Sequence, residues 1–113
     1  RIGLAVAASM WNALRANKAG RSWEALVGYT IDELRHHLEA RFLPGMSWDN
    51  WGKYGWHIDH VIPRSAFNYQ TTGDEDFRRC WALSNLQPLW AADNIRKQAK
   101  ISGHFQPTLA LGA

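Results

Sequence analysis

The stretch WHIDHVIP, which ends at Pro63, places two histidines and an aspartate within four positions among bulky apolar residues. A short apolar run of this kind predicts a buried β-strand, here over residues 56–62. An ordinary buried strand has no need of His57, Asp59 and His60. This stretch therefore constrains the fold and the function together, because the rest of the chain has to account for an ionisable cluster inside a strand.

The elements after this strand are predicted from apolar runs and turn residues. Residues 71–74, Thr-Thr-Gly-Asp, predict a turn into a short helix that carries Cys80 and Trp81. Residues 86–90 then predict a second short apolar strand, and residues 91–100 predict a helix. The expected order is strand, excursion, strand and helix, with no internal repeat.

The N-terminal part is predicted to be helical. Apolar residues at helical spacing favour a first helix over 2–18, and the Thr-Ile-Asp-Glu segment 30–33 forms a capping box that starts a second one. The second helix ends before Pro44, because proline disfavours helical geometry in the preceding residue. His36 and His37 lie off its apolar stripe and are expected at the surface. The stripe comprises Ile31, Leu34, Leu38 and Phe42.

Seven of the 113 residues are tryptophan and 46% are hydrophobic, so the chain can build a core. Residues 46–55 predict a packed loop. Trp48, Trp51 and Trp56 could stack on nucleotide bases, but clustered tryptophans in a small chain favour a core. Because the length fits one compact unit, we expect a single domain over 1–113.

The net charge is only +3, but basic residues gather at the two ends. Residues 1–21 carry four basic residues and no acidic one, and residues 94–113 carry three and no acidic one. The middle, 22–93, has six basic and ten acidic residues, a net charge of −4 (6 − 10). This segregation suits a polyanion such as nucleic acid, although solvated helix faces would give the same pattern.

Cys80 is the single cysteine, which excludes an internal disulfide and a paired-cysteine zinc site and fits a reducing compartment. No base lies near it in the sequence, so a catalytic thiol is not expected. The chain lacks any run of about 18 apolar residues, so a membrane span is not expected either.

Three segments, WHIDHVIPRSAF, SNLQPLW and DNIRK, resemble in this order the HNH endonucleases, a ββα-metal nuclease family, in the variant whose third signature residue is asparagine. The preceding TIDELRHHLEARFLPGMSWDNWGKYG is similar to the leader of small phage-type members. The resemblance implies an α+β fold with a ββα-metal core over 56–100, made of two short antiparallel strands and a helix. A helical leader over 1–45 and a tail over 101–113 would complete the chain.

The resemblance also implies roles for the signature positions. His60 is similar to the general base that takes a proton from the attacking water. Asp59 and Asn94 are similar to the side-chain ligands of one divalent metal, and Asn85 is similar to the asparagine that holds the excursion carrying the base. The implied reaction is hydrolysis of a DNA phosphodiester, leaving a 5′-phosphate and a 3′-hydroxyl.

Elementary chemistry supports these roles. A phosphodiester needs an activated nucleophile, charge neutralisation at the phosphate and help for the leaving oxygen, which one base and one metal can supply. A neutral imidazole, whose ordinary pKa is about 6.5, can accept a proton near neutral pH. A carboxylate and an amide oxygen favour Mg²⁺ or Mn²⁺, whereas zinc prefers nitrogen and sulfur ligands.

The helix expected over 91–100 explains a further set of basic residues. Asn94 lies near its N-terminus, where unpaired amide groups favour an anion, and basic side chains on the same face can follow it. Ile95 and Ala99 are expected to face the core. The residues expected to contact DNA phosphate are Lys97, Lys100 and Arg96.

Strand geometry leaves two interpretations of the base open. Side chains alternate along a regular strand, so Asp59 shares a face with His57, while His60 points the other way. Either the strand ends or bulges near Asp59 and His60 is the base, or His60 is structural and His57 does the work. In the first case His57 could support the metal, bind it or simply pack.

Two other classes of function remain open. A catalytically inactive DNA-binding module on the same fold would keep the basic ends, and a structure-specific nuclease acting on junctions or RNA would keep the same catalytic residues. The expected partner is DNA, double-stranded, with one Mg²⁺ or Mn²⁺ per chain, in the cytoplasm of a bacterial or phage-infected cell. One centre per chain and no long heptad predict a monomer that nicks duplex DNA.

Overall fold

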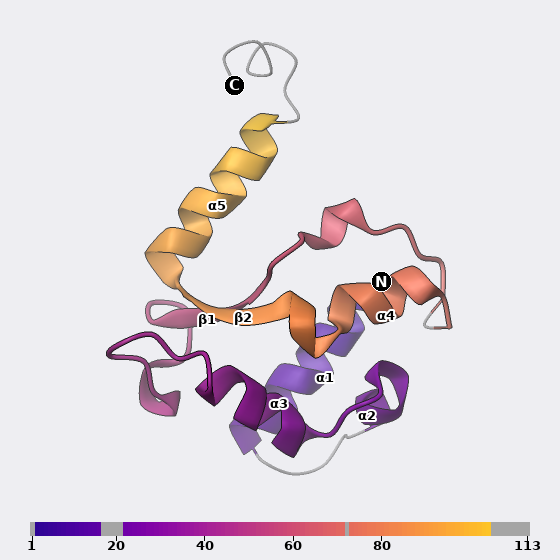
Figure 1. The fold of residues 1–113 in the computed structure, drawn as a ribbon, viewed down its shortest axis with the longest axis horizontal. Coiled ribbons are helices and arrows are strands. Elements are labelled where there is room, and N and C mark those ends of the chain that lie inside the picture. Colours follow the sequence, from indigo (N-terminus) through magenta and orange to yellow (C-terminus); the bar gives the residue numbers. More distant parts are fainter. Residues whose placement is uncertain (1, 17–21, 72, 105–113) are drawn as a thin grey trace. The chain divides into compact units, whose positions relative to one another are not determined.

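The computed structural model describes residues 2–16, 22–71 and 73–104 and has the expected α+β class (Figure 1). In this part of the chain, five α-helices accompany a two-stranded antiparallel sheet of β1 and β2. The elements are α1 (Ile2–Ala16), α2 (Ser22–Val27), α3 (Ile31–Glu39), β1 (Trp56–His60), α4 (Glu75–Trp81), β2 (Leu86–Trp90) and α5 (Ala91–His104), with 3-10 turns at Trp48–Asn50, Arg64–Ala66 and Leu83–Asn85. The expected order of strand, excursion, strand and helix is confirmed.

The chain separates into two compact units. The first comprises Arg1–Arg41 and His60–Gln87, and the second comprises Phe42–Asp59 and Pro88–Ala113. The division passes through both strands, so each unit holds part of β1 and part of β2. The single domain over 1–113, with a leader over 1–45, a core over 56–100 and a tail over 101–113, stays a prediction.

Backbone hydrogen bonds extend the strand pairing at both ends. In the first unit, the amide of Val61 donates to the carbonyl of Asn85 (2.8 Å). In the second unit, the amide of Ala91 donates to the carbonyl of Gly55 (2.8 Å). From the first bond to the second, the residue numbers fall along β1 and rise along β2, as antiparallel pairing requires.

In the first unit, α3 begins at the capping box that the sequence predicts. The Thr30 hydroxyl accepts a hydrogen bond from the Glu33 amide (3.2 Å), and the Glu33 carboxylate accepts one from the Thr30 amide (2.8 Å). The helix ends at Glu39, earlier than expected, so Phe42 is not part of its stripe. The stripe residues within the helix are fully buried, as expected: Ile31, Leu34 and Leu38.

Helix α2 is an element that the apolar spacing does not predict. Its Glu24 carboxylate accepts a hydrogen bond from the amide of Ile31 (2.7 Å), so this short helix caps the first turn of α3. Its Trp23 is 1% exposed and lies edge-on to Tyr29, with ring centroids 6.2 Å apart. One short helix thus supplies both a polar cap and a core aromatic residue to the first unit.

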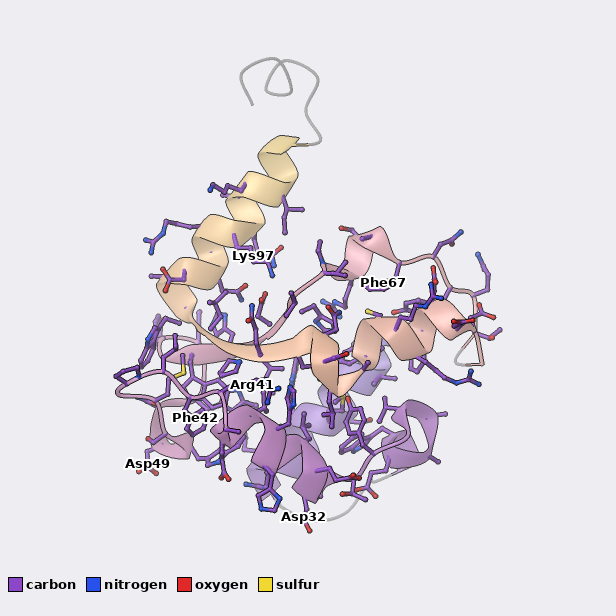
Figure 2. All side chains as sticks on the ribbon, viewed as in Figure 1. Asp32, Arg41, Phe42, Asp49, Phe67 and Lys97 are labelled. Carbon is purple, nitrogen blue, oxygen red and sulfur yellow. The ribbon has the colours of Figure 1, made fainter. Side chains whose placement is uncertain are left out.

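The second unit is built around an aromatic cluster. Phe42, labelled in Figure 2, Trp48 and Trp51 surround the fully buried Trp56, with ring centroids 5.1, 5.2 and 5.9 Å from it. The indole N–H of Trp56 donates to the carbonyl of Ser47 (2.7 Å). The core interpretation is confirmed for Trp56, whereas Trp48 and Trp51 are half-buried members of the cluster.

The turn before β1 requires glycine at one position. A Cβ at Gly55 would lie 1.5 Å from the carbonyl oxygen of Asn50, which backbone atoms cannot tolerate. The Asn50 side chain donates to the carbonyl of Gly45 (2.8 Å) and accepts from the amide of Ser47 (2.9 Å). These bonds fix the loop from which β1 starts.

Candidate functional site

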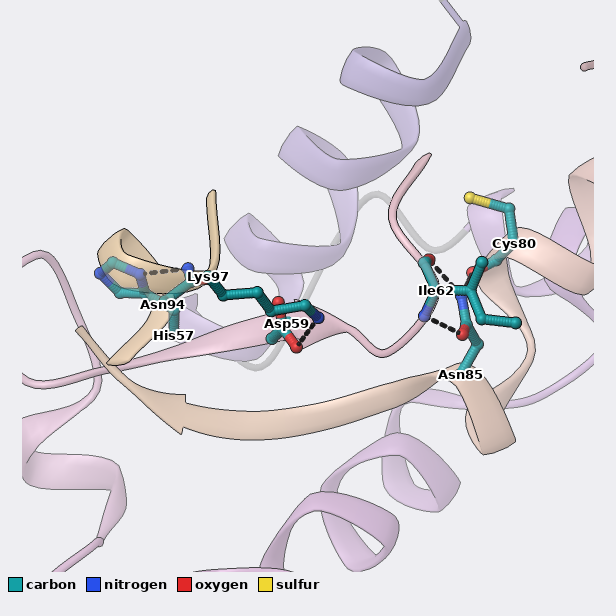
Figure 3. Close-up of polar contacts among 7 residues, drawn as sticks. All are labelled: His57, Asp59, Ile62, Cys80, Asn85, Asn94 and Lys97. Atoms are coloured by element: carbon teal, nitrogen blue, oxygen red, sulfur yellow. Dashed lines mark hydrogen bonds and ion pairs between the residues drawn. The ribbon is translucent and has the colours of Figure 1, made fainter. Parts of the chain in front are cut away.

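His57 and Asp59 share a face of β1, and their partners lie on α5 of the same unit (Figure 3). Alternate residues of a strand project to one side, and residues three apart in a helix project to one side. Asn94 and Lys97 satisfy the second condition. The result is two contacts between the elements, His57 with Asn94 and Asp59 with Lys97.

Asp59 is a buried carboxylate with a cationic partner. It is 3% exposed, and its Oδ2 accepts a hydrogen bond from the Lys97 ammonium at 2.7 Å. A buried carboxylate needs such a partner, because an uncompensated charge is expensive to remove from water. Lys97 was expected at DNA phosphate, and here it neutralises Asp59 instead.

Both nitrogens of His57 are engaged. Nε2 lies 3.2 Å from the carbonyl oxygen of Lys53, and Nδ1 lies 2.8 Å from Nδ2 of Asn94. A carbonyl oxygen only accepts, so Nε2 must carry the hydrogen, and Nδ1 of the neutral ring then accepts from the Asn94 amide. The Lys53 carbonyl therefore sets the tautomer of His57, and His57 sets the orientation of Asn94.

The orientation of Asn94 leaves its oxygen available to a ligand. Oδ1 is buried and makes no hydrogen bond to any described residue. This oxygen and the Asp59 carboxylate are both hard oxygen donors of the second unit, and donors of this type fit Mg²⁺ or Mn²⁺. The part of the chain that the structure describes has no group of three or more His, Cys, Asp and Glu suited to a metal. Asp59 and Asn94 as the ligands of one divalent ion therefore stay a prediction of the sequence.

His60 belongs to the first unit, where it lies against Trp81 at the end of α4. The two rings meet edge to face, with centroids 4.6 Å apart. The carbonyl of Trp81 accepts a hydrogen bond from the Tyr29 hydroxyl (2.6 Å), and burial, with a further contribution from Cys80, raises the pKa of Tyr29 far above its ordinary value. Tyr29 thus remains a neutral donor that anchors the residue on which His60 rests.

Asn85 joins the two ends of the excursion between the strands. Its Oδ1 accepts from the amide of Ile62 (2.8 Å), and its Nδ2 donates to the carbonyls of Ile62 (3.1 Å) and Cys80 (2.9 Å). The side chain is buried, and it lies in the first unit with both partners. Asn85 therefore holds the chain immediately after His60, which is a positioning role.

Cys80 is an unreactive core residue. It is fully buried, and burial raises the pKa of its thiol to about 11, against an opposing effect of Arg64 and with a smaller contribution from Asp76. A thiol with this pKa is almost entirely protonated near neutral pH, so it is a poor nucleophile. The sequence interpretation that excludes a catalytic thiol agrees with this environment.

The other side chains of α5 differ partly from expectation. Ile95 is 64% exposed and Ala99 is also exposed, so the expectation that they face the core is wrong. The face of α5 toward β1 carries Asn94 and Lys97 instead. Exposed Arg96 forms an ion pair with Asp93 on its own helix, whereas Lys100 is exposed at the surface.

Of the basic residues in the N-terminal segment, Arg15 is exposed on α1. Arg1, Lys18 and Arg21 lie outside the described residues. Of the two α3 histidines expected at the surface, His36 is exposed, but His37 is half-buried and its Nε2 lies 2.8 Å from the carbonyl of Leu86.

Sequence patterns missed the two contacts that organise the site. The Lys53 carbonyl could not have been found, because backbone contacts leave no mark on residue type. The Lys97–Asp59 pair did leave a signal, since a carboxylate in an apolar strand needs a cation. That cation had three candidates on one helix, and only tertiary contact selects Lys97.

Comparison with known proteins gives one informative similarity. An uncharacterised protein of Acanthamoeba polyphaga mimivirus is 40% identical over 75 residues, which is 66% of this chain and 32% of that protein. The chain thus spans about a third of the length of this relative. No family model and no solved structure matches the chain. In the described part of the chain, none of the helices has the length and apolar character to cross a membrane.

Proposed function

We propose that this chain is an HNH-type, metal-dependent endonuclease that hydrolyses DNA phosphodiester bonds and nicks duplex DNA. The observation that carries the proposal is the buried, hydrogen-bond-free Oδ1 of Asn94 on the same side of α5 as the contact to the buried Asp59 carboxylate. A buried polar oxygen without a hydrogen-bond partner costs free energy, because it has lost its contacts with water. A bound metal ion would supply the missing partner.

In the proposed reaction, Asp59 and Asn94 would hold one Mg²⁺ or Mn²⁺ ion, and the chemistry that such an ion would supply is charge neutralisation at the phosphate and help for the leaving oxygen. His60 accepts the proton of the attacking water. Asp59 and His60 are consecutive residues, so their Cα atoms are about 3.8 Å apart. Chain connectivity alone thus keeps the base next to a ligand.

The contacts of His57 favour His60 as the base. A general base needs a nitrogen lone pair that can reach water. In His57, Nε2 donates to the Lys53 carbonyl and the lone pair of Nδ1 accepts from Asn94. His57 therefore acts on the site by orienting Asn94. The proposal keeps His60 as the base, as the resemblance implies, with its chain segment held in place by Asn85.

The proposed partner is double-stranded DNA, approached by a monomer. Lys100 is exposed on α5 and is the proposed phosphate contact. Arg96 would contribute less, because Asp93 already neutralises it. The proposed location is the cytoplasm of a bacterial or phage-infected cell.

The test is a supercoiled-plasmid assay with Mg²⁺, with and without EDTA. We expect cleavage that EDTA abolishes, and a loss of about 10²–10⁴ in rate for His60→Ala with DNA binding kept. His36→Ala, which changes an exposed histidine on α3, is the matched control and should cut normally. Normal cutting by His60→Ala would contradict the assignment, and single-stranded DNA and RNA substrates tested in parallel would reveal a different specificity.

A second candidate function is a DNA-binding module without catalysis. The Lys97–Asp59 ion pair favours it, because an ammonium already neutralises the carboxylate that a metal would use. Such a module would retard DNA in a gel, leave plasmid supercoiled and bind no Mn²⁺. The same plasmid assay therefore separates the two functions.

A further inference from the structure

We infer that Lys97 is an exchangeable counter-cation, which occupies Asp59 in the free protein and gives way to the divalent ion when the site is loaded. This inference rests on the proposed function, because it concerns the same metal site. It assigns Lys97 a role different from that of a fixed phosphate contact. The contact that carries it is the 2.7 Å pair between Nζ and Oδ2.

Burial makes a cation at Asp59 obligatory. Only 2% of the Asp59 side chain is exposed, so water cannot stabilise its charge. Of the basic residues on α5, Lys97 meets this need, while Arg96 pairs with Asp93 and Lys100 lies at the surface. Lys97 thus neutralises the carboxylate without a metal.

The ammonium and a divalent ion cannot both hold the same carboxylate closely. Like charges at a few ångströms repel strongly when water is largely excluded. The Lys97 side chain is the member of the pair that can move, because it is 26% exposed and has a flexible four-carbon stem. Asp59 is fixed in β1 and cannot move away.

Exchange links metal binding to DNA binding. When the ion takes Asp59, the displaced ammonium needs a new anion, and a DNA phosphate supplies one. Phosphate binding then favours the displaced position of Lys97, and by linkage it raises metal affinity. The free protein accordingly binds metal weakly, and the complex with DNA binds it more tightly.

The test measures Mn²⁺ binding by isothermal titration calorimetry without DNA, so it does not depend on cleavage. Lys97→Met keeps the length of the side chain and removes its charge, and we expect Mn²⁺ affinity to rise by about tenfold. Lys97→Arg keeps the charge and should bind like the wild type. Arg78→Met removes an exposed charge from α4, outside the proposed site, and is the control, with affinity unchanged within about twofold.

Two binding results would overturn the inference in distinguishable ways. If wild type and Lys97→Met bind Mn²⁺ equally, or the variant binds more weakly, exchange is wrong while the nuclease proposal stands. If neither binds Mn²⁺ and EDTA has no effect on plasmid cleavage, the metal site is wrong and exchange fails with it.

A folding defect in Lys97→Met would also be informative, because the variant leaves Asp59 buried without its cation. Circular dichroism with EDTA and with millimolar Mn²⁺ distinguishes the outcomes. Exchange predicts that a variant unfolded in EDTA refolds on addition of Mn²⁺, since the ion replaces the missing charge. A variant that remains unfolded with Mn²⁺ would overturn the inference.

Discussion

The orientation of the Asn94 side chain, a candidate metal ligand, is set through His57 by the backbone carbonyl of Lys53. The Lys53 carbonyl requires a hydrogen on Nε2 of His57, Nδ1 then requires a donor, and Asn94 supplies it with Nδ2. Its oxygen is thereby directed away from His57. Removing an outer contact of this kind typically lowers metal affinity by about 10–100-fold.

His57→Ala should therefore weaken Mn²⁺ binding by roughly tenfold to a hundredfold without unfolding the protein. His57→Gln should recover part of the affinity, because its amide offers one donor for Lys53 and one acceptor for Asn94. Calorimetry without DNA makes the measurement, with His36→Ala as control. Equal affinity in all three variants would show that His57 merely packs.

The buried thiol of Cys80 gives a pH-dependent prediction. Its pKa is raised from 9.0 to about 11, so the unfolded chain loses the proton first. The stabilisation is complete below pH 9 and is lost as the pH rises through 11. We expect the free energy of unfolding, measured in urea, to fall across this window. Cys80→Ala should reduce the slope, and an unchanged slope would contradict the assignment.

At the scale of elements, the excursion between β1 and β2 depends on one side chain. Asn85 makes three hydrogen bonds to Ile62 and Cys80, and it directly precedes β2. Within the excursion, α4 is anchored by its buried Phe77, Cys80 and Trp81, whereas the segment after β1 is tied to the segment before β2 by these polar bonds.

Asn85→Ala should lower the free energy of unfolding by about 2–4 kcal/mol, because buried backbone groups lose their partners. Thr30→Ala, which removes the exposed cap of α3, should cost only about 1 kcal/mol. Urea denaturation of both variants makes the comparison. If Asn85→Ala costs no more than Thr30→Ala, the excursion is held by other contacts. Plasmid cleavage should fall in Asn85→Ala beyond the loss of folded protein, because His60 would be poorly held.

At the scale of the whole molecule, the two strand halves belong to different compact units, and so do Asp59 and His60. The peptide bond between them keeps the proposed base and the proposed metal ligand consecutive in the chain. The proposed site has one base, His60, and one metal-binding pair, Asp59 with Asn94, so a chain with this site would hydrolyse one phosphodiester at a time.

We therefore expect supercoiled plasmid to become open circles first, with linear DNA appearing later from accumulated nicks. Affinity for DNA should fall as salt rises, because phosphate contacts release counterions. A time course on agarose gels at several enzyme dilutions makes the measurement. Linear product from the first turnover, at an unchanged rate per chain on dilution, would refute a single-centre monomer.

Local spacing was enough to predict much of the framework. The capping box at 30–33, the buried Ile31, Leu34 and Leu38, and the order of strand, excursion, strand and helix all follow from near neighbours in the chain. The helix α2 escaped prediction because a six-residue helix presents too few turns for a periodic signal.

The sequence by itself determined most of the elements, with the exception of α2, and placed the ionisable cluster on a strand, because these depend on residues a few positions apart. Tertiary structure alone decided that Lys97 pairs with Asp59, that His57 orients Asn94, and that Ile95 faces outward. Those contacts join residues 37 and 38 positions apart. Helical spacing offers several faces for packing, and the choice among them depends on how α5 lies against β1.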